Sequence, residues 1–246
     1  MGSLRVKNVR KSRALWQTDH VADVDVLVVE DAPEYARLIA DVLVAAGHRP
    51  RITTSVAEAT EALRAALPDL LILDLGLPDG DGLDLCALVR DHSNAYIMVV
   101  SGRSERLDAV RGFNLGADDY VLKPFSSREF AARVEAVLRR PRQAAKGGLP
   151  RIIGELRIDV HAREVSLAGE RVELTKLEFD LIEVLSADPK AVLTRRQLLE
   201  RVWGENWYGD DHVVDVHIAN LRRKIDVPGS PSVIRTVRGV GYSMSV

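Results

Sequence analysis

Short apolar runs alternate with amphipathic segments along the first half of this chain, between residues 24 and 140. The apolar runs are typical of buried strands and cover residues 24–29, 49–53, 70–73, 96–100 and 119–122. The segments between and after them have helical spacing and cover residues 34–46, 56–67, 83–91, 107–115 and 127–139. Strands that alternate with helices predict a parallel sheet covered on both faces. We therefore expect a doubly wound, flavodoxin-like α/β domain with a five-stranded parallel sheet.

The pattern changes after residue 140. Residues 141–149 have the composition of a linker and include two consecutive glycines. The next residues alternate in short pieces up to residue 174, which is typical of a small antiparallel sheet. Three helical segments and a glycine-broken hairpin follow, at residues 175–187, 194–203, 210–225 and 233–244. We interpret residues 23–140 and 150–246 as two domains, the second an α+β winged helix, and residues 1–22 as a flexible extension.

Composition excludes several classes of protein. The 246 residues include a single cysteine, Cys86, so an internal disulfide cannot form. No apolar run approaches the roughly 18–20 residues that span a bilayer, and no secretory signal is visible. A soluble, cytoplasmic protein without a membrane partner is expected. The net charge of −2 hides a local basic patch, formed between residues 217 and 238 by Arg222, Arg223, Lys224, Arg235 and Arg238.

Charged and hydroxyl side chains stand where the predicted strands end. Glu30 and Asp31 follow the first strand, and Asp74, Ser101 and Lys123 follow or end the third, fourth and fifth. The topology brings all five to one edge of the sheet. Three carboxylates would repel one another there unless a cation lies among them, and oxygen ligands with water suit Mg²⁺. An aspartate in such a site can attack phosphorus, while the lysine and the hydroxyl stabilise the phosphoryl oxygens.

Seven segments resemble those of a known family. VVED at 28–31, LDLGLP at 73–78, VSG at 100–102 and GADDYVLKPF at 116–125 resemble receiver-domain signatures. LTKLEF at 174–179, VDVHI at 214–218 and RTVRGVGY at 235–242 resemble the OmpR/PhoB class of two-component response regulators. The resemblance extends from about Val24 to the C-terminus.

The resemblance implies roles for the matching residues. Asp74 would be the phosphoacceptor, and Asp31, Asp74 and the Gly76 carbonyl would bind Mg²⁺, with Glu30 reaching the metal through water. Lys123 and Ser101, which stands where threonine is more usual, would contact the phosphoryl group, and Tyr120 would be an aromatic switch. Taken singly, these residues have other interpretations: Glu30 and Asp31 could cap the helix that starts at Pro33, and Tyr120 could be a packed strand residue.

The helix predicted near the C-terminus has two distinct faces. Val214, Ile218, Leu221 and Ile225 form a stripe directed to the core. The opposite face carries short and polar residues that suit the major groove of DNA, with Arg222 at its edge; the candidates for DNA contact are His212, Val216, Asn220, Arg222 and Arg223. A solvated surface helix is the alternative.

The terminal hairpin would be the wing of the winged helix. The resemblance makes Arg235, Thr236 and Arg238 its DNA contacts, with Arg238 in the minor groove. The family often carries arginine where this chain has His212 and Asn220, so its usual phosphate contact and its target sequences do not transfer. Residues 203–212 would form the loop that touches RNA polymerase, although Trp203 could instead pack within the domain.

The resemblance also implies a homodimer on phosphorylation. Receivers of this class pair through the fourth helix, the fifth strand and the fifth helix, and the matching charged residues are Asp118, Asp119, Glu129, Arg133 and Arg140. A basic residue on the fourth helix is usual opposite the glutamate that matches Glu129, but this chain has Ala109 there.

We therefore expect a transcription regulator that a sensor histidine kinase phosphorylates on Asp74 and that binds tandem half-sites of double-stranded promoter DNA as a dimer. It would catalyse only its own phosphoryl transfer and dephosphorylation. One alternative is a DNA-binding regulator that phosphate does not control. The other is a phosphatase with Asp74 as nucleophile, which generally needs a second acid at the position of Gly76.

Overall fold

The computed structural model describes residues 24–102, 106–138, 149–204 and 211–245. In the N-terminal domain, five parallel strands form one sheet in the order β2-β1-β3-β4-β5. The strands are β1 (Asp25–Val29), β2 (Arg49–Thr53), β3 (Leu70–Leu73), β4 (Tyr96–Ser101) and β5 (Asp119–Leu122). The predicted doubly wound domain is confirmed, and the strand order is the flavodoxin-like one.

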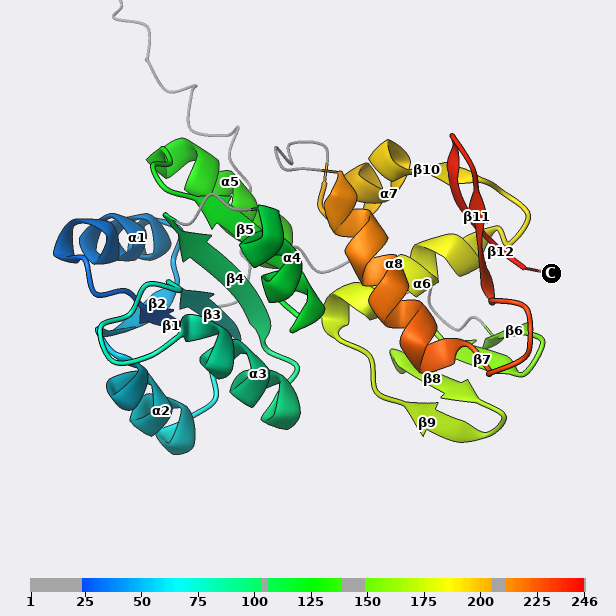
Figure 1. Ribbon diagram of the computed structural model, residues 1–246, viewed down its shortest axis with the longest axis horizontal. Helices are drawn as coiled ribbons and strands as arrows, with labels where there is room; N and C mark the ends of the chain where they lie inside the picture. The colour runs from blue at the N-terminus through cyan, green and yellow to red at the C-terminus, as the bar shows by residue number, and fades with distance from the viewer. Residues whose placement is uncertain (1–23, 103–105, 139–148, 205–210, 246) are drawn as a thin grey trace, which may run out of the picture.

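Helices cover both faces of this sheet (Figure 1). They are α1 (Pro33–Ala45), α2 (Val56–Ala65), α3 (Gly82–His92), α4 (Arg106–Asn114) and α5 (Ser127–Leu138). Successive strand residues point to opposite faces, so Val26 and Val28 pack with Ile39 of α1 and Phe130 of α5. Leu27 and Val29 join the cluster formed with α2, α3 and α4.

Local signals fix where helices begin. Pro33 stands in the first turn of α1, where its missing N–H costs nothing. The Ser55 side chain accepts from Glu58 N at the start of α2, and the Asp79 carboxylate accepts from Val56 N at 2.7 Å. These contacts satisfy backbone N–H groups that the first turn leaves without partners. They also tie the loop after β3 to the start of α2.

The C-terminal domain has a four-stranded antiparallel sheet, three helices and a hairpin. The sheet consists of β6 (Arg151–Ile153), β7 (Leu156–Asp159), β8 (Glu164–Leu167) and β9 (Glu170–Val172). The helices are α6 (Lys176–Ala187), α7 (Arg195–Val202) and α8 (His212–Ile225), and the hairpin is β11 (Ile234–Val237) with β12 (Gly241–Met244). The predicted winged helix is confirmed. A short strand that was not predicted, β10 (Leu193–Thr194), pairs with β12.

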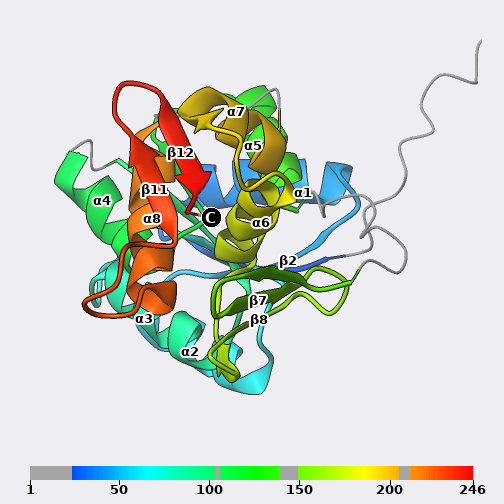
Figure 2. The same ribbon diagram turned by 90° about the vertical axis from the view of Figure 1, so that its right-hand side faces the viewer.

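The two domains share one hydrophobic cluster. The cluster on the α2–α3–α4 face of the parallel sheet includes Phe113 of α4 and continues into Trp203 and Ile218 of the C-terminal domain. Helices α4 and α8 lie side by side in both views (Figures 1 and 2). The domains therefore pack directly against each other. Among the described residues, no helix is long and apolar enough to cross a membrane.

Gly82, the first residue of α3, lies against the strand end that carries Asp74. A Cβ atom at Gly82 would come within 2.3 Å of the Asp74 carbonyl oxygen. Because the carbonyl oxygen belongs to the backbone and cannot turn aside as a flexible side chain can, Gly82→Ala should displace α3 and lower the free energy of unfolding by about 1–3 kcal/mol. Urea unfolding measures the change. Gly102→Ala is the control, since its Cβ would meet nothing within 4 Å, and equal stabilities of the two variants would contradict the prediction.

Candidate functional site

Three carboxylates gather at the carboxyl edge of the parallel sheet. Glu30 and Asp31 follow β1, and Asp74 follows β3, the strand beside it. One oxygen from each residue lies within 4.8 Å of the others. Glu30 and Asp74 are buried, whereas Asp31 is exposed. The edge therefore concentrates negative charge at a point that solvent reaches from one side.

Lys123, directly after β5, holds two of these carboxylates. Its Nζ donates to Asp74 Oδ2 and to Glu30 Oε1, each at 2.7 Å, and it lies 4.4 Å above the ring centre of Tyr35. The lysine therefore reaches across the edge of the sheet, since β4 and β3 lie between β5 and β1. Its charge offsets part of the repulsion between the carboxylates.

Burial and pairing act in opposite directions on these groups. Burial raises the pKa of Glu30 above its ordinary value of 4.5, although Lys123 opposes the shift. Burial would lower the pKa of Lys123, but its hydrogen bonds to Asp74 and Glu30 outweigh that effect and raise it. Lys123 therefore stays protonated and keeps its two partners together.

The donor set suits a hard divalent cation. Asp31 presents an exposed carboxylate beside Asp74. Among the described residues, the buried Oε2 of Glu30 has no hydrogen-bond donor, although it forms an ion pair with the Lys123 ammonium 2.6 Å away. These oxygens retain acceptor capacity, which Mg²⁺ can use directly or through water. The Gly76 N–H donates to Asp74 Oδ1 at 3.1 Å and shapes the turn that carries the predicted carbonyl ligand.

Ser101 and Tyr120 lie near this edge. Ser101 ends β4, is buried, and its carbonyl accepts from Lys123 N at 2.9 Å. Tyr120 is half-buried on β5, and its ring centre is 6.3 Å from that of Phe113 on α4. The five residues predicted to meet therefore all lie at the carboxyl edge of the sheet: Glu30, Asp31, Asp74, Ser101 and Lys123. Tyr120 connects β5 with α4 through its contact with Phe113.

The predicted DNA-binding residues fall into two groups. His212, Arg223, Arg235, Thr236 and Arg238 are exposed, and Val216 is half-buried. Arg222 is half-buried, and its guanidinium donates to the Ile234 carbonyl at 2.6 Å and to Thr236 Oγ1 at 2.8 Å. Arg222 therefore holds the hairpin against α8 through Nε and Nη2.

A second anchor fixes the hairpin to α8. The Asp215 carboxylate accepts from Tyr242 Oη at 2.5 Å and from Arg195 Nε at 2.7 Å, and His212 Nδ1 lies 3.1 Å from it. Burial would raise the pKa of Asp215, but these hydrogen bonds lower it. Gly241 allows β12 to lie close to β10, because a Cβ there would lie 2.0 Å from the Leu193 carbonyl oxygen.

Asn220 and its neighbours on α8 face the N-terminal domain. The Asn220 Nδ2 donates to the Phe113 carbonyl at 3.0 Å, and the residue is only 6% exposed. Trp203 Nε1 donates to the Asp118 carbonyl at 3.3 Å. His217, on the same flank of α8, contacts the rings of both Phe113 and Trp203. In this arrangement Asn220 serves the domain contact rather than an outer surface.

Sequence reasoning did not identify this contact. Lys176 at the start of α6 adds to it, with Nζ 4.3 Å from the ring centre of Tyr96. Each residue has an ordinary local interpretation as a core aromatic or a surface lysine. One signal was available in α8. The flank that carries Val213, His217 and Asn220 is less polar than a face in contact with solvent is expected to be.

The residues predicted to pair two receivers make ion pairs within one chain. Asp118 and Asp119 are fully buried; Asp118 lies 2.6 Å from Arg90, and Asp119 lies 3.2 Å from Arg133. Arg133 also contacts Glu129 at 3.2 Å. Ala109 is half-buried on α4. Arg140 lies outside the described residues, as does most of the predicted polymerase-contacting loop beyond Trp203, which is itself buried against the other domain.

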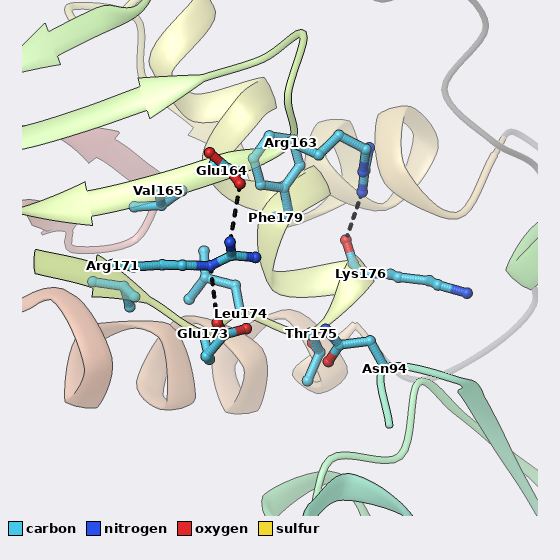
Figure 3. A pocket seen from close by; sticks show the side chains of 11 residues that line it. Asn94, Arg163, Glu164, Val165, Arg171, Glu173, Leu174, Thr175, Lys176 and Phe179 are labelled. Carbon is cyan, nitrogen blue, oxygen red and sulfur yellow. Dashed lines mark hydrogen bonds and ion pairs between the residues drawn. The ribbon is translucent and has the colours of Figure 1, made fainter. Parts of the chain in front are cut away.

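A pocket lies where the domains meet, between Asn94 and the β8–β9–α6 region (Figure 3). Its charged groups pair with one another: Arg171 contacts Glu164 at 3.0 Å and Glu173 at 2.9 Å, and Arg163 donates to the Lys176 carbonyl at 3.2 Å. These contacts hold the β8–β9–α6 region together. None of the described residues that line the pocket belongs to the acidic edge.

Comparison with known proteins agrees with this geometry. Residues 26–135 match the family model of the response regulator receiver domain, and residues 169–244 match that of the transcriptional regulatory protein, C terminal. The DNA-binding response regulator MtrA of Mycolicibacterium smegmatis is 42% identical over 88% of this chain and 95% of its own length. The sensory transduction protein RegX3 of Mycobacterium bovis is 40% identical over 89% and 98%.

A solved structure of a RitR mutant has a TM-score of 0.74, with 30% identity over 89% of this chain and 98% of that chain. Together with the two family models, these similarities are decisive. The chain belongs to the two-component response regulators, in the OmpR/PhoB class.

Replacing Lys123 tests the electrostatics of the acidic edge. Lys123→Met should lower the free energy of unfolding by about 3 kcal/mol near pH 7.5, because it leaves two buried carboxylates without their cation. The pKa of Glu30 is already raised and should rise further, so the folded state binds a proton that the unfolded state releases above 4.5. Stability should therefore recover as the pH falls through that raised pKa.

Urea unfolding at several pH values, with and without Mg²⁺, measures this effect. Lys190→Met, which removes an exposed lysine, is the control and should change little. A deficit in Lys123→Met that is the same at about pH 5 and pH 7.5 would show that the loss is one of packing rather than charge.

Proposed function

We propose that Asp74 is the phosphoacceptor of this regulator and that a sensor histidine kinase supplies its phosphoryl group. The observation that carries the proposal is the pairing of Lys123 Nζ with Asp74 Oδ2 at 2.7 Å, beside the exposed Asp31. The ammonium holds the Asp74 carboxylate in place, and a carboxylate oxygen is the nucleophile that the reaction needs. An Asp74 oxygen would attack phosphorus while the bond from phosphorus to the kinase histidine breaks, and the imidazole nitrogen keeps the electron pair.

Asp31, Asp74 and the Gly76 carbonyl would hold Mg²⁺, with Glu30 reaching it through water. The ion would supply charge neutralisation for the phosphoryl oxygens. Lys123 is positioned to follow those oxygens away from the carboxylate, and the Ser101 hydroxyl at the end of β4 would donate to them. The site has Gly76 where an aspartate-nucleophile phosphatase generally needs a second acid, which favours a regulator that transfers only its own phosphoryl group.

The C-terminal domain would bind double-stranded promoter DNA. Helix α8 would enter the major groove with its outer face, and the hairpin would reach the minor groove through Arg238. Arg222 acts as the residue that fixes the hairpin to α8. The residues proposed to touch DNA are the half-buried Val216 and the exposed His212, Arg223, Arg235, Thr236 and Arg238.

The packing of α4 on α8 would be the resting state of the regulator. The Phe113 carbonyl accepts from the Asn220 amide. Without that contact, the amide would be available to hydrogen-bond an adenine base. Phosphorylation would act by changing the face formed by α4, β5 and α5, to which Tyr120 and Phe113 belong. Separation would release Asn220 to DNA and the same receiver face to a second receiver.

A homodimer through that face would reuse buried ion pairs. Asp119 and Arg133 make their pair within one receiver, so pairing of receivers would depend on exchanging or extending such contacts, with Glu129 at the rim and Arg140 beyond the described residues. RNA polymerase is a further proposed partner, through the loop between α7 and α8. The alternative of a regulator independent of phosphate is disfavoured because all five site residues are brought together.

Asp74→Asn should abolish phosphoryl uptake from a small phosphodonor, because an amide is not a nucleophile toward phosphorus. Intact-mass measurement should show a gain of about 80 Da, one phosphoryl group, on the wild type in Mg²⁺ and none on the variant. Omitting Mg²⁺ should slow uptake by the wild type. Asp84→Asn, in the exposed first turn of α3, is the control. An adduct on Asp74→Asn would move the acceptor elsewhere.

Two arginine variants should weaken DNA binding in different ways. Arg238→Ala should flatten the salt dependence of affinity by about one phosphate contact, because the hairpin supplies charge. Arg223→Ala should cost about 1–3 kcal/mol on a specific duplex if it reads a base, and less on a scrambled one. Salt titrations of binding by the phosphorylated protein measure both. Arg171→Ala, on the β6–β9 sheet, is the control, and unchanged affinity for both test variants would reject the interface.

A further inference from the structure

His217 lies at the centre of the contact between the two domains. Its side chain projects from α8 and is 1% exposed. Its ring centre is 5.7 Å from that of Phe113, on α4 of the receiver. It is 5.9 Å from that of Trp203, in the C-terminal domain. The imidazole therefore contacts an aromatic ring of each domain, and removal of the receiver would uncover the side that Phe113 now covers.

A neutral imidazole suits this apolar setting, whereas a protonated one does not. The Nε2 atom has no hydrogen-bond partner in the part of the chain that the structure describes. Protonation would give both ring nitrogens a hydrogen to donate and would place a charge where burial has removed water. The cost applies while the domains are packed together, because water can solvate the charged ring once they part.

The charges around His217 act in the same direction. Arg90 of α3 and Lys224 of α8 are the cations whose charge acts on the imidazole. Their carboxylate partners are engaged with them, since Asp118 lies 2.6 Å from Arg90 and Glu178 of α6 lies 2.7 Å from Lys224. Burial first, and then the two cations, lower the pKa of His217 from its ordinary value of 6.5 to about 3.

We propose that His217 is an acid-sensitive latch: its neutral imidazole keeps the receiver on α8, and its protonation separates the two domains without phosphorylation. Asn220 lies nearly one turn further along α8 and is held by the Phe113 carbonyl. Separation therefore exposes part of the DNA-reading face. The inference rests on the proposed function for this consequence alone, since the separation itself involves no DNA.

The direction of the effect follows from the difference between the packed and separated states. A base with a lowered pKa in the packed state stabilises packing above its ordinary pKa and loses that contribution as the pH falls below it. With His217 near its ordinary pKa in the separated state, titration of His217 alone should raise the ratio of separated to packed molecules about tenfold between pH 7.5 and 5.5.

Asp118 acts against the latch and must be distinguished from it. Burial raises the pKa of Asp118 to about 6, so in the pH range of the test it gains a proton in the packed state. To the extent that packing causes that shift, acid favours packing through Asp118. A comparison of variants at His217 cancels this contribution, because Asp118 is common to all of them.

The indole N–H of Trp203 reports separation directly, because it donates to the Asp118 carbonyl across the contact. Its exchange with solvent would be followed by NMR in the unphosphorylated full-length protein between pH 7.5 and 5.5, after correction for the intrinsic pH dependence of indole exchange. His217→Phe retains an aromatic ring but has no group that can be protonated. His217→Gln retains a neutral side chain that can form hydrogen bonds. His161→Gln, at an exposed histidine, is the matched control.

Between pH 7.5 and 5.5, exchange in the wild type and in His161→Gln should accelerate about tenfold more than in the two His217 variants. The same pH dependence in all four proteins would overturn the latch. Binding to promoter DNA is measured separately, and comparison with the His217 variants removes any contribution of the exposed His212. Acid-accelerated exchange without DNA binding would leave the latch standing and reject the proposed function.

Discussion

The packing of His217 against Phe113 of the receiver and Trp203 of its own domain is the contact on which the rest of this structure depends. It joins the cores of two domains that could each fold around their own apolar residues, so that one hydrophobic cluster extends through both. Large aromatic side chains contribute most of the free energy of such contacts. Two hydrogen bonds, from Trp203 to Asp118 and from Asn220 to Phe113, give the contact a defined register. A receiver and a DNA-binding domain that would otherwise be tethered only by a linker thus acquire one arrangement.

The acidic edge and this contact are physically connected. Lys123 follows β5, the strand that carries Tyr120, and the Tyr120 ring lies beside Phe113. Asp118 and Asp119, at the start of the same strand, are bound by Arg90 and Arg133. A change of charge at Asp74 therefore acts on the lysine at one end of β5, while the other end holds the carbonyl that accepts from Trp203. Strand β5 thus connects the acidic edge with the contact between the receiver and the C-terminal domain.

Periodicity was sufficient to predict the elements of the fold because each amphipathic segment buries its own stripe. Its limits appear at particular residues. Strand β10 has two residues, too few for any period to show. Asp118, Asp119 and Arg133 were expected to meet a second receiver, yet each pairs within the chain, since a charged residue in a sequence does not reveal which opposite charge lies beside it. Arg222 was expected to meet DNA, but its distance from the Ile234 carbonyl depends on a turn of the chain that spacing does not predict. The acidic edge was predictable because parallel topology alone brings strand ends together.

The packed arrangement also places a thermodynamic requirement on the regulator. Asn220 is buried against the receiver, so a base cannot reach its amide while the domains are packed. Packing of the domains and the proposed binding of DNA by that residue therefore exclude each other. Phosphorylation and protonation of His217 are proposed to act on that same equilibrium, one through β5 and the other at the contact itself. Coupling between binding events is reciprocal. DNA must therefore favour the separated state by the factor by which separation favours DNA, and it must raise the proton affinity of His217 as the receiver leaves it. A promoter bound to this protein is thus, by the same argument, a ligand that promotes its activation.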